Sequence, residues 1–145
     1  MIVKRAVREQ EIKQAFHVRT TVFVHEQHVP PEEEIDHFDK AATHFIGIQD
    51  NTAIAASRLR FTGDYGKLER ICVVKEQRGK SYGTQLIAEM EAEIIENGYQ
   101  KAKLNAQTHA EIFYKQLGYE TISGEFLDAG IPHVTMIKQL TDRLD

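Results

Sequence analysis

The chain has 145 residues, of which 41% are hydrophobic and 28% charged, as in a folded domain with a buried core. Its net charge of -4 provides no basic surface for DNA or RNA, so we expect no nucleic-acid partner. One cysteine excludes an internal disulfide, and no apolar run reaches the length of a membrane span. We therefore expect a single cytoplasmic domain over residues 1–145, with no membrane association.

Hydrophobic periodicity and turn residues predict strands that alternate with helices in the middle of the chain and pair as hairpins at both ends. In chain order, the pattern predicts a strand over residues 2–7, a helix over 9–24, a loop at 30–34 that can include a turn of helix, strands over 44–48, 53–61 and 67–74, a helix from near 79 to 98, a strand over 101–106, a helix over 109–117, and strands over 121–126 and 134–138. The expected fold class is α/β, a mixed sheet covered by helices.

Local signals refine four boundaries. Asp50-Asn51 predicts a hairpin turn, and Gly98 is well placed to end the long helix. Thr108 and Glu111 match a capping box, so we expect Thr108 to cap the following helix and Gly118 to end it.

The most informative motif is Arg78-Gly79-Lys80-Ser81-Tyr82-Gly83, which follows a strand and opens a helix. Such a turn directs unpaired backbone N–H groups and the helix dipole at one point, which favours a phosphate or pyrophosphate ligand. A nucleotide P-loop is excluded, because Val74 occupies the position of its first glycine. A dinucleotide fingerprint is excluded because its third glycine is absent. For the motif alone, a glycine turn without a ligand stays the alternative.

The motif resembles the Arg/Gln-x-x-Gly-x-Gly/Ala pyrophosphate loop of the GNAT superfamily of N-acetyltransferases, which bind acetyl-CoA. It departs from the family at Ser81, where glycine is usual, so we expect altered packing and retained binding. Other segments resemble the ElaA/YjcF-like branch, in the same order and over nearly the whole chain. They are residues 22–27, Asp36, Asp39, His44, residues 104–110, Phe113, Tyr114, Gly118, Tyr119 and residues 130–133.

The resemblance implies the GNAT fold, a twisted and mostly antiparallel sheet that is splayed between its fourth and fifth strands and flanked by about four helices. It implies acetyl-CoA as co-substrate and transfer of its acetyl group to a primary amine by direct attack in a ternary complex. The implied cofactor-binding residues are Ile71, Cys72 and Val73 on the fourth strand, Arg78, Gly79, Lys80, Ser81, Tyr82, Gly83 and Thr84 in the loop, and Asn105 and Phe113 beyond it.

Tyr114 resembles the family tyrosine that protonates the departing CoA thiolate. A phenol with an ordinary pKa of about 10 can donate that proton at neutral pH. The alternative for Tyr114 is packing as an amphipathic core residue on a short helix.

The general base stays open. Glu69 and His133 are catalytic candidates, with Glu26 or a chain of water molecules as further choices. Glu69 has a structural alternative as an ion-pair partner of Arg70 or Arg58. The alternative for His133 is a hydrogen bond to a strand end.

Glu26, Gln107 and His109 are candidate substrate-binding residues for a small-molecule amine. The acidic residues 32–34 are expected to be solvated, although with Asp36 and Asp39 they could attract a cationic amine.

Two other chemistries are not expected. An acetyl-cysteine at Cys72 is disfavoured, because a lone cysteine on an apolar strand is usually a small buried hydrophobe. A metal is not expected, because the best histidine cluster has no cysteine partner. That cluster is His25, His28, His37 and His44.

Three questions stay open. A domain of this kind can sense acyl-CoA or dock on a partner without turnover, and release of free thiol would separate that role from catalysis. Transfer of a longer acyl group depends on pocket depth. Apolar edge strands leave a homodimer open.

Overall fold

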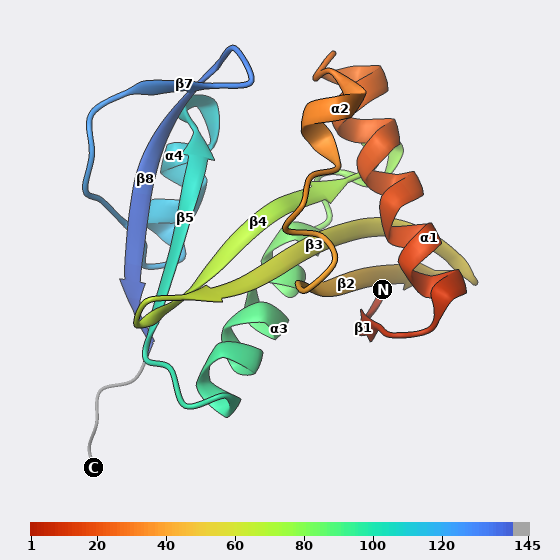
Figure 1. Ribbon diagram of the computed structural model, residues 1–145, viewed down its shortest axis with the longest axis horizontal. Coiled ribbons are helices and arrows are strands. Elements are labelled where there is room, and N and C mark those ends of the chain that lie inside the picture. The colour runs from red at the N-terminus through yellow and green to blue at the C-terminus, as the bar shows by residue number, and fades with distance from the viewer. Residues whose placement is uncertain (141–145) are drawn as a thin grey trace.

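The computed structural model describes residues 1–140 and contains one twisted, eight-stranded sheet flanked by helices (Figure 1). Its elements in chain order are β1 (Ile2–Ala6), α1 (Glu9–Arg19), the π-helix η1 (Thr20–Glu26), α2 (Pro31–Glu34), β2 (Thr43–Gln49), β3 (Thr52–Thr62), β4 (Tyr65–Val73), the 3-10 turn η2 (Lys75–Gln77), α3 (Tyr82–Glu96), β5 (Lys101–Gln107), the 3-10 turn η3 (Thr108–Ala110), α4 (Glu111–Gln116), β6 (Glu120–Thr121), β7 (Phe126–Asp128) and β8 (Ile131–Gln139).

The sheet consists of two arms that meet at one short parallel contact. Its strand order is β1-β2-β3-β4-β5-β8-β6, with β7 paired to β8, and every pairing is antiparallel except that of β4 with β5. The parallel pairing joins only residues 66–68 to residues 102–104. Beyond this contact β4 and β5 separate toward their carboxyl ends, and Figure 1 shows the resulting V between the arms. We call this opening the splay.

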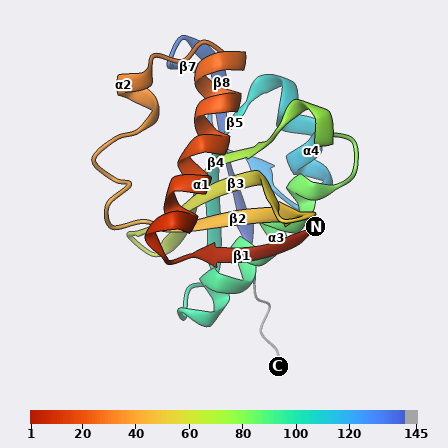
Figure 2. The same cartoon turned by 90° about the vertical axis from the view of Figure 1, so that its right-hand side faces the viewer.

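Helices cover both faces of the first arm because its central strands are apolar on both sides. On β2, Phe45 packs into the core under α3, whereas its neighbour Ile46 packs into the core under α1. On β3, Ala55 packs into the core under α3 and Ala56 packs into the core under α1. Successive side chains of a strand point to opposite faces, so this arrangement fixes the register of the arm. Figure 2 shows α1 lying across the arm.

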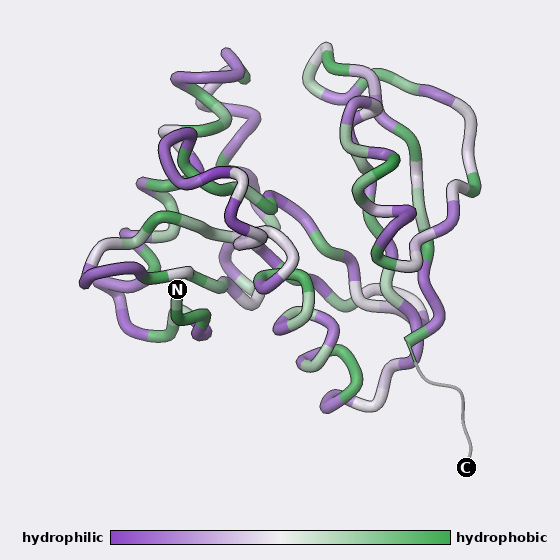
Figure 3. The backbone as a smooth tube through the Cα atoms, turned by 180° about the vertical axis from the view of Figure 1, so that it is seen from behind, coloured by the Kyte–Doolittle hydropathy of each residue, from purple (hydrophilic) through white to green (hydrophobic). Residues whose placement is uncertain are grey.

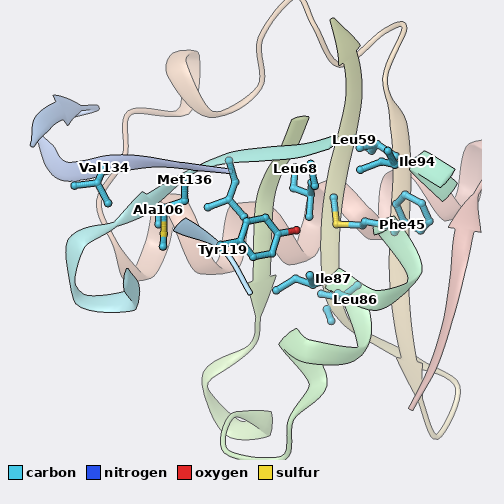
Figure 4. Close-up of a cluster of buried hydrophobic side chains, with 14 residues drawn as sticks. Phe45, Leu59, Leu68, Leu86, Ile87, Ile94, Ala106, Tyr119, Val134 and Met136 are labelled. Carbon is cyan, nitrogen blue, oxygen red and sulfur yellow. The ribbon is translucent and has the colours of Figure 1, made fainter. Parts of the chain in front are cut away.

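The core under α3 also holds the two arms together. The helix buries Leu86, Ile87, Met90 and Ile94, and the tube of Figure 3 alternates between hydrophobic and hydrophilic along it. This face contacts residues of both arms, which are drawn together in Figure 4. They include Leu59, Leu68, Leu104, Tyr119 and Met136.

The expected mixed, splayed sheet with four flanking α-helices is confirmed. The Asp50-Asn51 turn is also confirmed, because both residues have the positive φ of a tight hairpin. No helix within residues 1–140 is long and apolar enough to span a membrane.

Local structure differs from the predictions at both ends of the chain. The expected first helix changes to a π-helix at Thr20. The turn of helix that the sequence allowed in the loop at 30–34 is present as the short helix α2, which begins with Pro31. Proline suits a first helical position because its missing N–H would be unpaired there in any case.

The capping box at Thr108 is wrong. Thr108 starts the 3-10 turn η3, and no side-chain hydrogen bond caps η3 or α4. The carboxylate of Glu111 instead accepts a hydrogen bond from the hydroxyl of Thr121. The strand expected over 121–126 is divided into β6 and β7, which pair with different parts of β8.

Gly66→Ala tests the packing of α3 on the parallel contact. A Cβ atom at Gly66 would overlap Cγ1 of Ile94, which is fully buried. We expect the free energy of unfolding to fall by about 1–3 kcal/mol, as overpacking of a core usually costs. Urea denaturation measures this loss.

Gly124→Ala is the matched control, because a Cβ atom there meets nothing within 4 Å and the backbone does not require glycine. An equal loss of stability in both variants would contradict the proposed packing effect.

Candidate functional site

A cavity of about 490 Å³ occupies the splay. Its walls come from both arms: residues 67–73 of β4 on one side and residues 104–107 of β5 on the other. The end of η1 and α2 close it above the first arm, and α4 with the β7–β8 hairpin closes it above the second. Because β4 and β5 separate, segments that are distant in the sequence line the same cavity.

A β-bulge shapes the β4 wall. Arg58 of β3 pairs with Glu69, but Ala56, two residues away, pairs with Cys72, so β4 contains one extra residue. Arg70 accommodates it with a φ of 56°. Bulges bend a strand and redirect its groups, and they often lie beside active sites.

Two backbone amides of β4 face the splay. The N–H of Val74 donates to Ile54 of β3 at 2.9 Å. Since alternate N–H groups of a strand point to opposite edges, those of Val73 and Ile71 point toward β5. No strand in the described part of the chain pairs with β4 on that edge beyond Leu68, so these amides are available to a ligand.

The predicted pyrophosphate loop lies at the start of α3, a helix of 15 residues. Gly79 has a φ of 82°, and Ser81 has a φ of 63° at the N-cap position. Glycine adopts such values at no steric cost, whereas serine does not. The expected altered packing of Ser81 against the phosphates stays a prediction, as do the cofactor-binding roles of all the loop residues, 78–84.

Arg78 is held by Glu26. Its guanidinium donates two hydrogen bonds to the Glu26 carboxylate, at 2.6 and 2.7 Å, and its Nε donates to the carbonyl of Val73 at 2.9 Å. The hydrogen bond from Arg78 lowers the pKa of Glu26. Glu26 therefore contacts the loop predicted for the cofactor, and its proposed role toward the substrate stays a prediction.

Glu69 lies in the cavity wall within a group of cations. Its carboxylate accepts hydrogen bonds from Arg58 at 3.0 Å and Arg60 at 2.7 Å, and Lys67 approaches to 3.5 Å. Burial alone would raise the pKa of Glu69, but the hydrogen bond and charges of the arginines outweigh it and lower the pKa. The expected pairing with Arg58 is confirmed, and a direct pair with Arg70 does not form in the described structure.

His133 lines the cavity from β8 and is 8% exposed. Its Nδ1 lies 2.6 Å from the carbonyl oxygen of Ile131, so this nitrogen carries the proton of the neutral ring. The Nε2 atom has no hydrogen-bond partner within residues 1–140 and is not fully buried. His133 thus makes the expected strand-end hydrogen bond and also presents an unshared lone pair.

Tyr114 of α4 also lines the cavity, beside Phe113 and against Tyr119. Burial raises the pKa of Tyr114 to about 12. The phenol therefore stays protonated throughout the neutral and moderately alkaline range, as a proton donor requires.

A polar chain crosses the splay. The amide of Gln107, at the end of β5, donates to Gln27, just after η1, at 2.9 Å. Nε2 of His109 lies 2.7 Å from the carbonyl oxygen of the same Gln107 side chain. Asn105 instead accepts a hydrogen bond from Thr135 of β8 at 2.9 Å. Sequence reasoning did not single out Gln27 as a site residue.

Cys72 contributes backbone but no reactive thiol to the cavity. Its side chain is 5% exposed and packs in the core under α1. Burial raises the pKa of the Cys72 thiol to about 12, so almost no thiolate forms at neutral pH.

A buried ion network anchors the segment between α2 and β2. Arg19, which has no exposed surface, binds Glu34 at 2.9 Å and Asp39 at 2.6 Å. Arg58, which is 1% exposed, binds the same Asp39 at 3.0 Å and Asp36 at 2.7 Å. The expectation that Glu34 is solvated is wrong, because its side chain is buried and pairs with Arg19 and Arg70. Sequence reasoning missed Arg19, because hydrophobic periodicity does not reveal that a helical cation is buried against acids distant in the sequence.

Within residues 1–140, no group of three or more His, Cys, Asp or Glu side chains is arranged to hold a metal ion.

Comparison with known proteins matches residues 3–140 to the family model described as an acetyltransferase (GNAT) domain. The uncharacterised N-acetyltransferase YjcF of Bacillus subtilis is 45% identical over 134 residues, covering 92% of this chain and 96% of YjcF. A candidate N-acetyltransferase from Lactobacillus plantarum superposes with a TM-score of 0.90 at 26% identity, covering 96% of this chain and 97% of that one.

Two further solved structures share the fold. ElaA of Escherichia coli has a TM-score of 0.86 at 22% identity, covering 96% of this chain and all (100%) of its own. An aminoglycoside 6'-N-acetyltransferase complexed with coenzyme A has a TM-score of 0.77 at 14% identity, with 100% of both chains covered.

Asp39→Asn tests the buried network. Burial alone would raise the pKa of Asp39, but hydrogen bonds from Arg19 and the amide of Asp36, with the charge of Arg19, outweigh it and lower the pKa below its ordinary 3.8. The carboxylate therefore stabilises the fold above that value, and the contribution is lost as the pH falls toward the lower folded-state pKa. At pH 7 we expect Asp39→Asn to lower the free energy of unfolding by about 3–5 kcal/mol.

Urea denaturation over a series of pH values checks both points. The variant should lose less stability than the wild type when the pH falls from about 5 to about 3. Asp64→Asn is the control, because its exposed carboxylate pairs with Lys101 on the surface and should matter little. Parallel pH profiles for wild type and Asp39→Asn would contradict the assignment.

Ser81→Gly tests the backbone of the loop. Glycine relieves the left-handed conformation, so we expect the free energy of unfolding to rise by up to about 1 kcal/mol. Ser81→Ala removes the hydroxyl but keeps the conformational cost, and it should bring no gain. Thermal denaturation compares the three proteins, and equal gains in both variants would point to the hydroxyl instead.

Proposed function

Because this chain belongs to the GNAT family of acetyltransferases, we propose that it transfers the acetyl group of acetyl-CoA to a primary amine, by direct attack in a ternary complex. The observation that carries the proposal is the free edge of β4 in the splay, where two backbone amides and Tyr114 line one cavity. The cytoplasm is the proposed location, since a single cysteine suits a reducing compartment.

Acetyl-CoA would enter the splay with its pyrophosphate at the start of α3. The backbone N–H groups of Gly79, Ser81 and Gly83, with the dipole of the helix, suit that charge. Each terminal nitrogen of Arg78 keeps one N–H that does not bind Glu26, which would let the guanidinium contact the phosphates while it stays paired. The pantetheine group would lie between β4 on one side of the cavity and Asn105 and Phe113 on the other.

Chemistry would begin when the neutral amine attacks the carbonyl carbon of the thioester. The oxygen gains negative charge and accepts a hydrogen bond from the N–H of Ile71 or Val73. Loss of one such donor typically costs about 3–4 kcal/mol of transition-state stabilisation. Collapse of the intermediate breaks the carbon–sulfur bond, and Tyr114 protonates the departing thiolate. The product nitrogen loses its extra proton to a base.

His133 suits the role of base better than Glu69. The Nε2 lone pair of His133 is unshared, and Nδ1 is fixed as the protonated nitrogen. Glu69 has a lowered pKa and three cationic neighbours, which make its carboxylate a weak proton acceptor. A water molecule held by Glu69 could still relay the proton.

Tyr114→Phe tests the proposed acid. In an assay of free CoA thiol with acetyl-CoA and a panel of amines, we expect kcat to fall at least about tenfold. The dissociation constant of CoA, measured by calorimetry, should stay unchanged. Tyr99→Phe, on a tyrosine that packs against Phe61 away from the cavity, is the control.

Two other results would redirect the proposal. Tight binding of acetyl-CoA without thiol release from any amine would favour a non-catalytic acyl-CoA sensor. Absence of acetyl-CoA binding would overturn the cofactor itself.

A further inference from the structure

The cavity contains two carboxylates that have no partner. Its cationic side chains are all engaged: Lys67 approaches Glu69, Arg70 binds Glu34 and Asp36, and Arg78 binds Glu26. By contrast, the carboxylates of Glu33 and Asp128 make no ion pair or hydrogen bond within residues 1–140, although both residues line the cavity.

These two residues lie on opposite walls. Glu33 belongs to α2, above the first arm, and Asp128 ends β7, above the second. Figure 1 shows α2 and the β7–β8 hairpin at the same open end of the V, one on each side. A molecule that enters at this end therefore meets a wall with a free negative charge on each side.

Two further side chains of the cavity lining each have one atom without a hydrogen-bond partner within residues 1–140. Nε2 of His133, a residue only 8% exposed, has no hydrogen bond. Glu34, which is 1% exposed, leaves its Oε1 atom unpaired, whereas its Oε2 atom binds Arg19 and Arg70. Because Nε2 of His133 is not fully buried, a ligand in the cavity can donate a hydrogen bond to it, whereas Oε1 of Glu34 has almost no accessible surface and stays out of a ligand's reach. This end of the cavity thus offers an unshared acceptor nitrogen on His133 and the free negative charges of Glu33 and Asp128.

We propose that this end of the cavity selects an acceptor with two amino groups, one that reacts and a second that stays an ammonium ion between Glu33 and Asp128. The proposal rests on the proposed function, and it names the acceptor class as small di- or polyamines. The reacting nitrogen would meet Nε2 of His133, whose lone pair is unshared. The second nitrogen would supply the positive charge that the two carboxylates lack.

The solvent exposure of the two carboxylates limits how strongly they can favour a diamine over a monoamine. Glu33 and Asp128 are both exposed, so each contributes modestly and is screened by salt. Together they should separate a diamine from a monoamine of equal length by at least about fivefold in kcat/KM. The difference should appear in KM, because the distal ammonium is bound equally in the ground state and the transition state.

The test compares 1,4-diaminobutane with butylamine, 4-aminobutan-1-ol and 4-aminobutanoate in the thiol-release assay. Wild type is compared with Glu33→Gln, Asp128→Asn and the double variant. Glu32→Gln and Glu125→Gln are controls that remove neighbouring exposed charges outside the cavity lining. We expect the double variant to lose the preference for the diamine through KM, with butylamine unchanged, and the controls to retain it.

A second measurement separates this inference from the proposed function. Calorimetry of 1,4-diaminobutane binding to the CoA-loaded protein reports on the same residues without turnover. Binding that is lost in the double variant, with no acetylation, would support the diamine site and overturn the transferase. Acetylation of butylamine and the diamine with equal kcat/KM, unaffected by either variant, would overturn the diamine site and leave the transferase intact. A preference for 4-aminobutanoate would also overturn it.

Discussion

Pairing between β4 and β5 covers only residues 66–68 and 102–104, because two parallel strands that diverge cannot keep a hydrogen-bonded ladder. The rest of the site depends on this limit. Longer pairing would occupy the N–H groups of Ile71 and Val73 and close the cavity. The arms stay joined below the splay through the core under α3, so that core supports an opening which the backbone alone would not hold.

The buried ion network supports the part of the cavity where the amine substrate would bind. Burying Arg19 and Arg58 is costly unless every charge finds a partner, and such a network is poor as a source of stability alone. Its geometry is nevertheless specific: Asp39 bridges both arginines, and His44 contacts the backbone of Asp39 through Nε2. This holds the chain that follows α2 against β3 and β4, and so places Glu33 and Glu34 over the cavity.

Much of the fold could be predicted from the sequence because strands with regular alternation and the Asp50-Asn51 turn are determined by nearby residues. The failures have tertiary causes. Thr108 has the residue type of a helix cap, but Glu111 hydrogen-bonds Thr121 of β6 instead. At the site, Tyr114 and His133 could be predicted to share a region through a family resemblance. The pairing of Glu26 with Arg78 could not, because 52 residues separate the two.

The burial of Cys72 has a practical consequence for assays of this protein. It is the one cysteine of the chain, and its thiol lies in a packed core with a pKa of about 12. Disulfide and maleimide reagents attack thiolates that solvent can reach, so the folded protein should react with them very slowly. Without substrate, a colour or fluorescence signal from such a reagent would therefore report unfolding of the protein. During turnover of the folded protein, the signal would report the free thiol of the CoA product.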